Sequence, residues 1–239
     1  MNHLNPPQRE AVRYLSGPLL VLAGAGSGKT SVITQKIAHL INECGYQSKH
    51  ITAVTFTNKA AREMKSRVTE LLGNDKAKSL RVSTFHHLGL SIIRKELKTL
   101  GLKNGFSIFD SSDSYILIKE LLMLDDIDKD MVEFFQNQIS WLKNQLISPE
   151  DSVQQAQSKQ EQRLARVYLR YVEALKAYNA VDFDDLIYIP VKLFDAHREV
   201  LLQWQHKIRY LLVDEYQDTN TCQYHLIKQL TGVSGMLTA

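Results

Sequence analysis

The sequence has little cysteine and no long apolar run. Cys44 and Cys222 stand in unrelated contexts and no C-x-x-C pair occurs, so the spacing indicates neither a disulfide framework nor a zinc site. The N-terminal residues lack the apolar core of a signal peptide, and no apolar stretch reaches the length that crosses a bilayer. We therefore expect no membrane association and a reducing, cytoplasmic location.

An excess of charge of one sign is also missing, since the net charge is only +3 over 239 residues. Bulk charge therefore does not indicate nucleic-acid binding. The distribution is uneven, because residues 59–103 carry eleven Lys or Arg against four acids, whereas residues 110–130 carry seven acids against two lysines. A phosphate-contacting face and an ordinary solvated helix face explain the basic segment equally well. The 44% hydrophobic content is enough for a substantial core.

The most informative motif is a loop of small residues that follows the apolar residues 19–22. Its sequence, AGAGSGKT, departs from the G-x-x-x-x-G-K-[ST] pattern only at the first position. Such a loop between a strand and a helix presents backbone N–H groups to phosphate oxygens at a helix N-terminus. A chance glycine-rich turn is the alternative. The residues expected to contact nucleotide are Ala23, Gly24, Ala25, Gly26, Ser27, Gly28, Lys29 and Thr30, with Lys29 on the terminal phosphates and Thr30 on Mg²⁺.

A second motif lies far downstream, where residues 208–213 predict a buried parallel strand that ends in two carboxylates, Asp214 and Glu215. Carboxyl ends of strands are where α/β sheets bind ligands. We expect Asp214 to hold the Mg²⁺ shell, to which Glu215 also belongs, and Glu215 to polarise the water that attacks the γ-phosphate. Two solvated acids at a strand end are the alternative. Together the two motifs predict hydrolysis of a nucleoside triphosphate.

Patterning divides the chain into three segments. Residues 1–87 alternate strands and helices, which predicts a parallel sheet, and the apolar spacing of residues 88–203 predicts helices without a convincing strand. Residues 204–239 return to the sheet. The expected fold is an α/β, RecA-like P-loop domain that an all-helical segment interrupts.

Six segments carry a resemblance to a known family. In order, they are LNPPQREA at residues 4–11, the loop at residues 23–30, AVTFTNKAAREM at residues 53–64, STFH at residues 83–86, DFDDL at residues 182–186 and DEYQDTN at residues 214–220. In this order and spacing, the chain resembles the N-terminal part of the superfamily 1A DNA helicases, the Rep, UvrD and PcrA group, and most of all its Rep members.

The resemblance implies roles for further residues. Gln8 would recognise the adenine of ATP, and Gln217 would sense the γ-phosphate. Residues 1–87 and 204–239 would form subdomain 1A, with residues 88–203 as helical subdomain 1B, and single-stranded DNA would cross both. The whole helicase would use Mg²⁺ and ATP to move 3′-to-5′ on single-stranded DNA and to unwind a 3′-tailed duplex at the bacterial nucleoid. The residues expected at single-stranded DNA are Phe56, Thr57, Asn58, Lys59, Thr84, Phe85 and His86.

Family members also have a further helicase motif and a second RecA-like domain with two arginines at the γ-phosphate, and neither occurs in these 239 residues. We therefore expect a half-motor that binds Mg·ATP and single-stranded DNA weakly, hydrolyses ATP slowly and does not unwind alone. Its final strand, residues 235–239, would be a frayed sheet edge. Two other classes stay open: a binding protein without turnover that competes with a full-length helicase, and a small-molecule kinase.

Three smaller expectations concern single side chains. Asp184 and Asp185 are expected in structural capping rather than in chemistry. Trp141 is expected in the core, and so is Trp204. His86 and His87 are adjacent, but no further metal-binding residues occur near them at the spacing of a metal site, so we expect no metal there.

Overall fold

The computed structural model describes residues 4–24, 26–124, 129–232 and 235–239. The chain divides into two compact units. Unit 1 contains the chain up to Leu88 with Phe194–Thr219 and Tyr224–Ala239, and unit 2 contains Gly89–Leu193 with Asn220–Gln223. The sequence predicts the return to the first unit at residue 204, whereas the structure has it ten residues earlier, at Phe194. The difference arises because α12 (Arg198–Lys207) packs against η1 (Ser48–His50) of unit 1.

Unit 1 is built on a parallel sheet with the strand order β2-β1-β5-β6. The strands are β1 (Ile51–Thr55), β2 (Arg81–Thr84), β5 (Tyr210–Val213) and β6 (Met236–Thr238). β1 and β5 are buried along their whole length, as continuous apolar strands of a covered parallel sheet should be. The predicted parallel α/β sheet is confirmed, with strand ends shifted by one or two residues.

The sheet continues beyond β6 into the segment that leads to the phosphate loop. This segment forms an isolated bridge between Leu19 and Thr238 rather than a full strand. The Leu19 amide donates to the Leu237 carbonyl at 2.8 Å, and the Ala239 amide donates to the Leu19 carbonyl at 2.9 Å. β6 is thus paired on both sides, so the expectation that residues 235–239 form a frayed outer edge is wrong.

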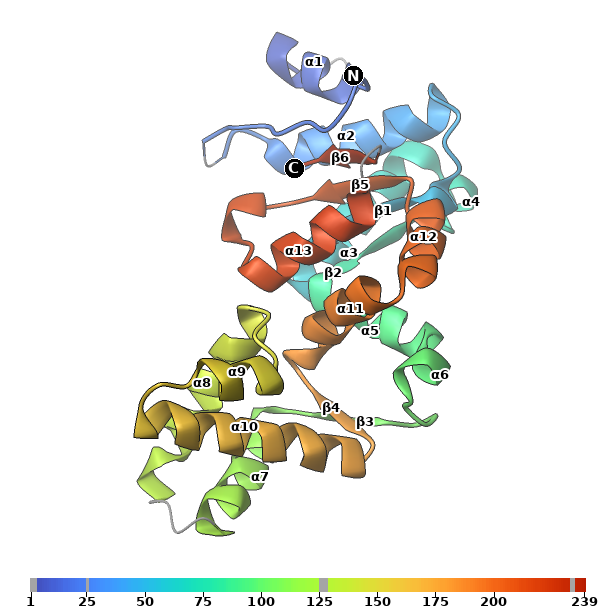
Figure 1. Ribbon diagram of the computed structural model, residues 1–239. Coiled ribbons are helices and arrows are strands. Elements are labelled where there is room, and N and C mark those ends of the chain that lie inside the picture. Colours follow the sequence, from blue (N-terminus) through green and yellow to red (C-terminus); the bar gives the residue numbers. More distant parts are fainter. Residues whose placement is uncertain (1–3, 25, 125–128, 233–234) are drawn as a thin grey trace. The chain divides into compact units, whose positions relative to one another are not determined.

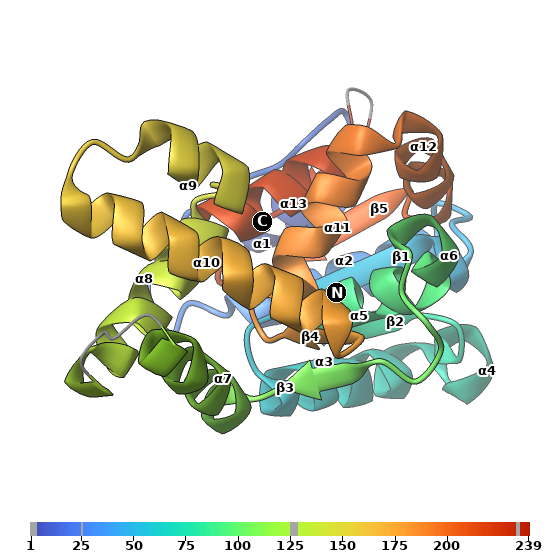
Figure 2. The ribbon, with the colours of Figure 1, turned by 60° about the horizontal axis from the view of Figure 1, so that its bottom comes forward.

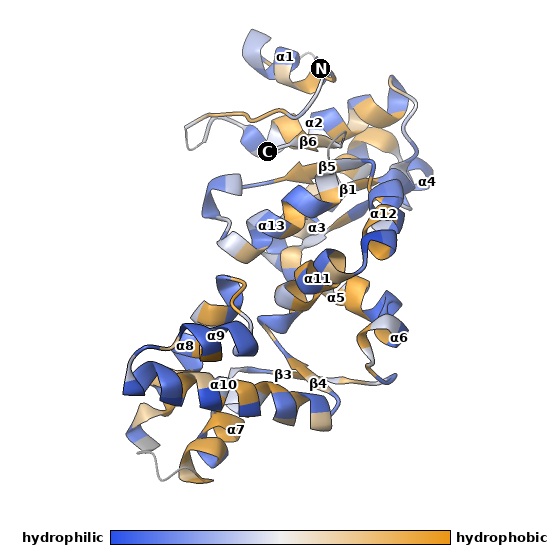
Figure 3. Ribbon diagram, in the orientation of Figure 1, coloured by the Kyte–Doolittle hydropathy of each residue, from blue (hydrophilic) through white to orange (hydrophobic). Residues whose placement is uncertain are grey.

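Helices cover both faces of this sheet (Figures 1 and 2). α2 (Lys29–Asn42) and α3 (Asn58–Leu72) pack on one face, and α12 with the part of α13 (Thr221–Thr231) from Tyr224 onwards lies on the other. Figure 3 shows apolar residues along β1 and β5 where these layers meet. Core residues of the first face include Ile33, Ile37, Leu40, Ile51, Ala53, Met64, Val68, Tyr210 and Leu212. Shorter helical elements of unit 1 are α1 (Pro6–Arg13), α4 (Asn74–Ala77) and η3 (Tyr216–Asp218).

Unit 2 is a helical body arranged around α10 (Lys159–Ala177), which contacts α7 (Ser111–Leu124), α8 (Val132–Asn144) and α9 (Pro149–Gln155) (Figure 1). Ser148 caps the start of α9, because its hydroxyl accepts from the Asp151 amide in a capping box. A 3-10 turn, η2 (Lys129–Met131), leads into α8. The core of this unit includes Leu117, Ile118, Leu122, Val132, Phe135, Ile139, Val167, Tyr168, Tyr171 and Leu175.

Two short strands correct the all-helical expectation for the inserted segment. β3 (Ser107–Phe109) and β4 (Ala180–Asp182) pair in parallel. Each has only three residues, too few to produce a recognisable alternation. Their partners also lie far apart in the sequence, so neither strand could be predicted from its own segment.

The remaining helices of unit 2 include two that it shares with unit 1. α5 (Phe85–Lys95) is followed by α6 (Leu97–Leu100), and α11 (Asp185–Ala196) runs through Pro190 without a break; α5 joins unit 2 from Gly89, and α11 leaves it after Leu193. At the start of α11, Asp182 Oδ1 accepts from the Asp185 amide at 2.8 Å, and Asp185 Oδ2 accepts from the Asp182 amide at 3.1 Å, so Asp185 takes part in capping as expected. Across the described parts of the chain, no helix is long and apolar enough to cross a membrane.

The DFDDL segment surrounds a buried cation that the sequence did not reveal. Lys143 is fully buried, and its Nζ donates to Asp182 at 2.6 Å and to Asp185 at 2.7 Å. Asp184 instead accepts from the Asn144 side chain at 3.0 Å. These contacts agree with the expected structural role of Asp184 and Asp185.

The two tryptophans behave differently. Trp204 is 2% exposed and packs in unit 1, as expected for a core residue. Trp141 is 53% exposed on α8, so the expectation that it lies in the core is wrong.

Candidate nucleotide-binding site

The phosphate loop leads directly into α2, and two of its glycines have backbone angles that other residues rarely adopt. Gly26 has φ +73° and Gly28 has φ +86°, which lie in the left-handed region that glycine tolerates. Gly28 is the N-cap of α2, so the loop ends where free helix N–H groups begin. Ala25 lies outside the described residues. Gly26 and Gly28 therefore have backbone angles that suit a phosphate-binding turn.

Lys29 and Gln8 both contact this loop. Lys29 Nζ lies 3.2 Å from the Ala23 carbonyl oxygen, and Gln8 Nε2 donates to the Ser27 carbonyl at 2.9 Å. Gln8 is held in place because its Oε1 accepts from the Asn5 amide at 2.9 Å within the capping box of α1. The structure thus brings the predicted adenine-binding residue to the phosphate loop, through a contact that spans nineteen residues of sequence.

Asp214 and Glu215 follow β5 at the carboxyl edge of the sheet. Asp214 continues the pairing with β1, since its amide donates to the Val54 carbonyl at 2.9 Å. The Asp214 side chain is buried, and its Oδ1 atom has no hydrogen-bond partner among the described residues. Burial, together with the neighbouring Glu215 carboxylate, raises the pKa of Asp214. A buried carboxylate oxygen without a partner is a suitable ligand for a hard cation such as Mg²⁺.

Glu215 has an unusual backbone and a defined side-chain partner. Its φ of +52° and ψ of +46° place a non-glycine residue in the left-handed region, where functional residues are enriched. Gln217 Nε2 donates to Glu215 Oε2 at 2.6 Å. The turn after β5 therefore holds the predicted base and the predicted γ-phosphate sensor against each other.

One cavity of about 200 Å³ joins these groups. Lys29, Asp214, Glu215 and Gln217 line it together, so two motifs far apart in the sequence form one site. Gln8, Thr30 and the loop residues before Lys29 lie outside this cavity lining. The sequence did not identify the apolar wall, which is formed mainly by Leu20, Val21, Leu22, Val32, Ile33 and Tyr216. The apolar residues on either side of the phosphate loop were the feature of the sequence from which this wall could have been predicted.

The residues predicted to contact DNA lie at the same sheet edge. Phe56 follows β1 and is half-buried, and the centroids of the Phe56 and Phe85 rings are 5.5 Å apart. Thr57 is the N-cap of α3, with its hydroxyl accepting from the Ala60 amide at 3.1 Å. Asn58 and Lys59 are exposed in the first turn of α3. This arrangement leaves the N-terminus of α3 open to a phosphate.

The second predicted DNA segment differs from the first in exposure. Thr84 is 8% exposed and Phe85 is 2% exposed, so the Phe85 ring packs in the protein and is not accessible to a base. Burial lowers the pKa of the half-buried His86. Within the described residues, no group of three or more His, Cys, Asp or Glu side chains is arranged to hold a metal ion. A DNA contact at residues 84–86 stays a prediction.

Comparisons with known proteins identify the family of this chain. The model of the family "UvrD/REP helicase N-terminal domain" matches residues 4–239. The chain is 53% identical over 237 residues to the ATP-dependent DNA helicase Rep of Escherichia coli. The aligned region covers 98% of the chain and 35% of that protein. It is 45% identical over 232 residues to the ATP-dependent DNA helicase PcrA of Staphylococcus aureus, covering 96% of the chain and 32% of PcrA.

A third relative, the Rep helicase of Buchnera aphidicola subsp. Acyrthosiphon pisum, is 44% identical over 236 residues, covering 98% of the chain and 37% of that protein. The chain thus spans about a third of the length of these relatives. Since the family model matches nearly every residue, the chain belongs to the UvrD/REP helicase N-terminal domain family.

Proposed function

We propose that this chain binds Mg·ATP and hydrolyses it, as the nucleotide-binding N-terminal part of a 3′-to-5′ DNA helicase. The observation that carries the proposal is the shared cavity of Lys29, Asp214 and Glu215. A phosphate-binding lysine beside a metal-binding aspartate and a glutamate base is the arrangement that phosphoryl transfer to water requires. By analogy with its relatives, the whole protein would act on DNA at the bacterial nucleoid.

Each side chain has a distinct role in this proposal. Lys29 would bind the terminal phosphates, and Asp214 Oδ1 with the Thr30 hydroxyl would hold Mg²⁺, which neutralises phosphate charge when bound. Glu215 would take the proton of the attacking water. Gln8 would recognise adenine, since a side-chain amide has two N–H groups and two acceptor sites. One of each is used by Ser27 and Asn5, which leaves one of each for the base.

Single-stranded DNA would bind at the carboxyl edge of the sheet. The N-terminus of α3 would contact a phosphate, and the Phe56 ring would stack on a base without regard to sequence. Because Phe85 is buried and Phe56 is partly exposed, we assign the stacking to Phe56 alone. DNA and nucleotide would then bind to loops that follow neighbouring strands. This provides a short route by which ATP hydrolysis could change DNA binding.

We expect turnover to be slow in these 239 residues. Lys29 is the only positively charged residue among those that line the described cavity. Arginines that stabilise charge on the γ-phosphate typically contribute about 10³–10⁵ in rate. Translocation also requires a second domain that closes on the nucleotide, so we expect no unwinding of a 3′-tailed duplex by this chain alone.

The test is ATP hydrolysis with and without oligo-dT, for the wild type, Lys29→Ala and the control Lys98→Ala. Lys98 is an exposed lysine on α6 of unit 2. We expect DNA-stimulated turnover that Lys29→Ala abolishes and Lys98→Ala preserves. Phe56→Ala should weaken oligo-dT binding by about 1–3 kcal/mol, the usual contribution of stacking on one base.

Turnover also separates the proposal from the alternative of a binding protein. ATP and DNA binding by a folded chain without hydrolysis would support that alternative, in which the chain competes with a full-length helicase. Phosphate transfer to a small acceptor without a response to DNA would indicate a kinase. Robust unwinding by the chain alone would contradict our view that it is only part of a motor.

A further inference from the structure

A second and larger cavity lies at the opposite edge of the sheet in unit 1. Its volume is about 840 Å³, within the range of roughly 300–1,000 Å³ that is usual for small-molecule sites. Lys49 and His50 immediately precede β1, and Arg209 immediately precedes β5. Because the strands are parallel, their amino ends meet here, away from the carboxyl edge that holds the phosphate loop.

The charged residues of this cavity all have one sign. Its described lining includes Lys49, Arg209 and the histidines His50 and His206, but neither aspartate nor glutamate. Neither Lys49 nor Arg209 forms a salt bridge with any carboxylate among the described residues. Two cations without acidic partners around a concave surface provide a favourable potential for an anion.

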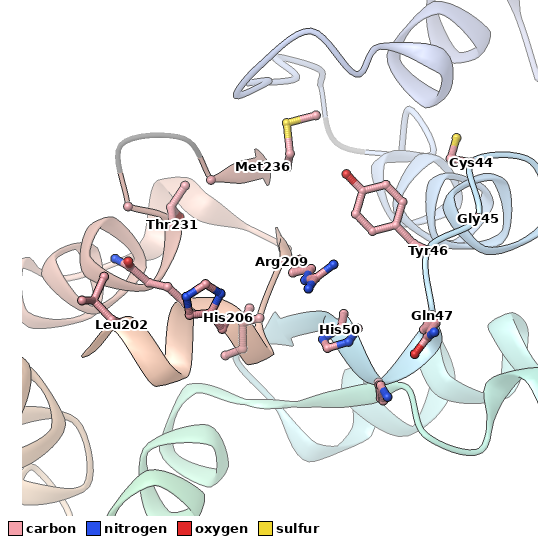
Figure 4. Close-up of a pocket in the computed structure, with 15 residues that line it drawn as sticks. Cys44, Gly45, Tyr46, Gln47, His50, Leu202, His206, Arg209, Thr231 and Met236 are labelled. Atoms are coloured by element: carbon pink, nitrogen blue, oxygen red, sulfur yellow. The ribbon is translucent and has the colours of Figure 1, made fainter. Parts of the chain in front are cut away.

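The His50 side chain and the backbone at Arg209 are held in position by the protein. His50 Nδ1 donates to the Lys207 carbonyl at 3.1 Å, and the Arg209 amide donates to the His50 carbonyl at 2.9 Å. Figure 4 shows Arg209 between His206 and Tyr46, with Met236 above them. This part of the wall is therefore fixed by backbone contacts at the start of β1 and β5, as a preformed site requires.

The lining also includes apolar and aromatic side chains beside these cations. The Tyr46 ring packs edge-on against Tyr210 with centroids 5.8 Å apart, and Ile208 and Met236 also line the cavity. Glycines at Gly45 and Gly232 contribute no side chain to the space. A ligand that fills this cavity would thus combine an anionic group with a flat apolar group.

We propose that this cavity is a second ligand site, which binds a nucleoside di- or triphosphate. The phosphates would contact Arg209 and Lys49, with His206 beside them, and the base would lie against Tyr46 and Met236. The cavity has the volume of a small-molecule site rather than the extended groove that a nucleic-acid strand occupies. Nucleotide bound here would act at the amino ends of β1 and β5, whose carboxyl ends carry the DNA-facing loop and Asp214.

The test counts ADP sites by titration calorimetry and locates them by NMR of ¹³C-methyl methionine. We expect two ADP sites in the wild type and one in Lys29→Ala. In Lys29→Ala, ADP should still shift the Met236 methyl signal, assigned with Met236→Leu, and should leave that of the fully buried Met64 unchanged. Arg209→Gln and Lys49→Gln should each weaken this site about tenfold, the usual effect of losing one charged hydrogen bond.

The control is the pair Arg163→Gln and Lys159→Gln, which removes the same charges from α10 of unit 2. Retained ADP binding at the Lys29 site shows that an Arg209 or Lys49 variant is folded. A single ADP site that Lys29→Ala abolishes, without a Met236 shift, would overturn the proposal. So would a Met236 shift produced by oligo-dT or an oligo-glutamate peptide but not by ADP. If ADP does not bind at the phosphate loop, the wild type will have a single ADP site. Arg209→Gln will weaken that site, and Lys29→Ala will leave it unchanged.

Discussion

Gly89 in α5 lies against the carbonyl oxygen of Leu186 in α11, so closely that a Cβ atom at Gly89 would overlap it. Pro190 stands four residues after Leu186 and has no N–H group, so this carbonyl cannot accept the usual helix hydrogen bond. The Pro190 ring also lies beside the same position, with its Cγ 3.6 Å from where the Cβ would be. The glycine thus permits two helices to meet at the turn that proline disturbs.

This contact reverses the usual effect of alanine in a helix. In a helix interior, Gly→Ala normally stabilises by about 0.5–1 kcal/mol. Gly89→Ala should instead lower the free energy of unfolding by about 2 kcal/mol, since α5 and α11 must move apart to admit the methyl group. Urea unfolding followed by circular dichroism measures the change.

Gly101→Ala is the matched control, because Gly101 has φ +68° but open space around its Cβ position. Gly101→Ala should lower the free energy of unfolding by about 1 kcal/mol, from backbone strain alone. If Gly89→Ala is as stable as the wild type, or more so, the close approach of Gly89 to Leu186 is refuted.

The Gly89 contact also illustrates why part of this fold could not be predicted. α11 continues through Pro190, and the residue that contacts this turn, Gly89, lies about a hundred positions earlier in the sequence. The same applies to β3 with β4 and to Lys143 with Asp182. In each case the partner lies outside the sequence window that patterning examines.

The candidate site could be predicted further than the fold because its motifs are local. The phosphate loop needs glycines at fixed offsets before a helix, and the carboxylates need only a buried strand before them, so both appear in short windows. Their meeting at one cavity followed from the rule that parallel strands bind ligands at their carboxyl ends. The burial of Phe85 and the exposure of Trp141 did not follow, because they depend on which helix covers each ring.

A buried lysine connects α1, which carries Gln8, to α2. Lys36 is 0% exposed, and its Nζ donates to the Ala11 and Tyr14 carbonyls, both at 2.7 Å. Lys36→Met would leave two partly buried carbonyl groups without this donor, which should lower the free energy of unfolding by about 1 kcal/mol. We expect faster amide hydrogen exchange in α1 and weaker ATP binding, because Gln8 would lose its fixed position.

Lys65 provides the control for this prediction. Its Nζ donates to the Ala77 and Leu80 carbonyls at 2.6 and 2.7 Å, so Lys65→Met removes the same pattern of contacts elsewhere in unit 1. It should destabilise the chain without raising exchange in α1. Equal exchange rates in α1 for both variants would show that Lys36 has no specific role there.

The ion cluster in unit 2 predicts a pH dependence of stability. Burial, reinforced by the Asp182 carboxylate, raises the pKa of Asp185 to about 6. Burial opposes ionisation of Asp182 as well, but the Lys143 charge and the hydrogen bonds from Lys143, the Asp185 amide and Tyr171 together outweigh it and lower the pKa of Asp182. Asp182 is therefore the ionised partner of Lys143, and Asp185 is the group that takes up a proton first.

As the pH falls, a carboxyl group with a raised pKa in the folded state takes up its proton at a higher pH there than in the unfolded state. Its contribution to stability is therefore largest below the unfolded pKa and is lost as the pH rises through about 6. Relative to Asp185→Asn, which cannot titrate, the wild type should gain about 1 kcal/mol between pH 7.5 and pH 5. Glu133→Gln, an exposed substitution on α8, should show no such difference. A wild type that loses stability relative to Asp185→Asn would contradict this sign.

The role of Glu215 can be separated from its contact with Gln217. In Glu215→Gln the new side chain keeps an oxygen that can accept from Gln217 Nε2, but it cannot take a proton from water. ATP affinity should stay within a few-fold of the wild type, whereas single-turnover hydrolysis should fall by about 10²–10⁴, the usual contribution of a general base. Asp218→Asn is the control, because Asp218 lies 3.4 Å from the same amide nitrogen and does not line the described cavity. Hydrolysis that persists in Glu215→Gln but fails in Asp218→Asn would assign the proton transfer to Asp218, and the left-handed backbone at Glu215 would then serve only to form the turn.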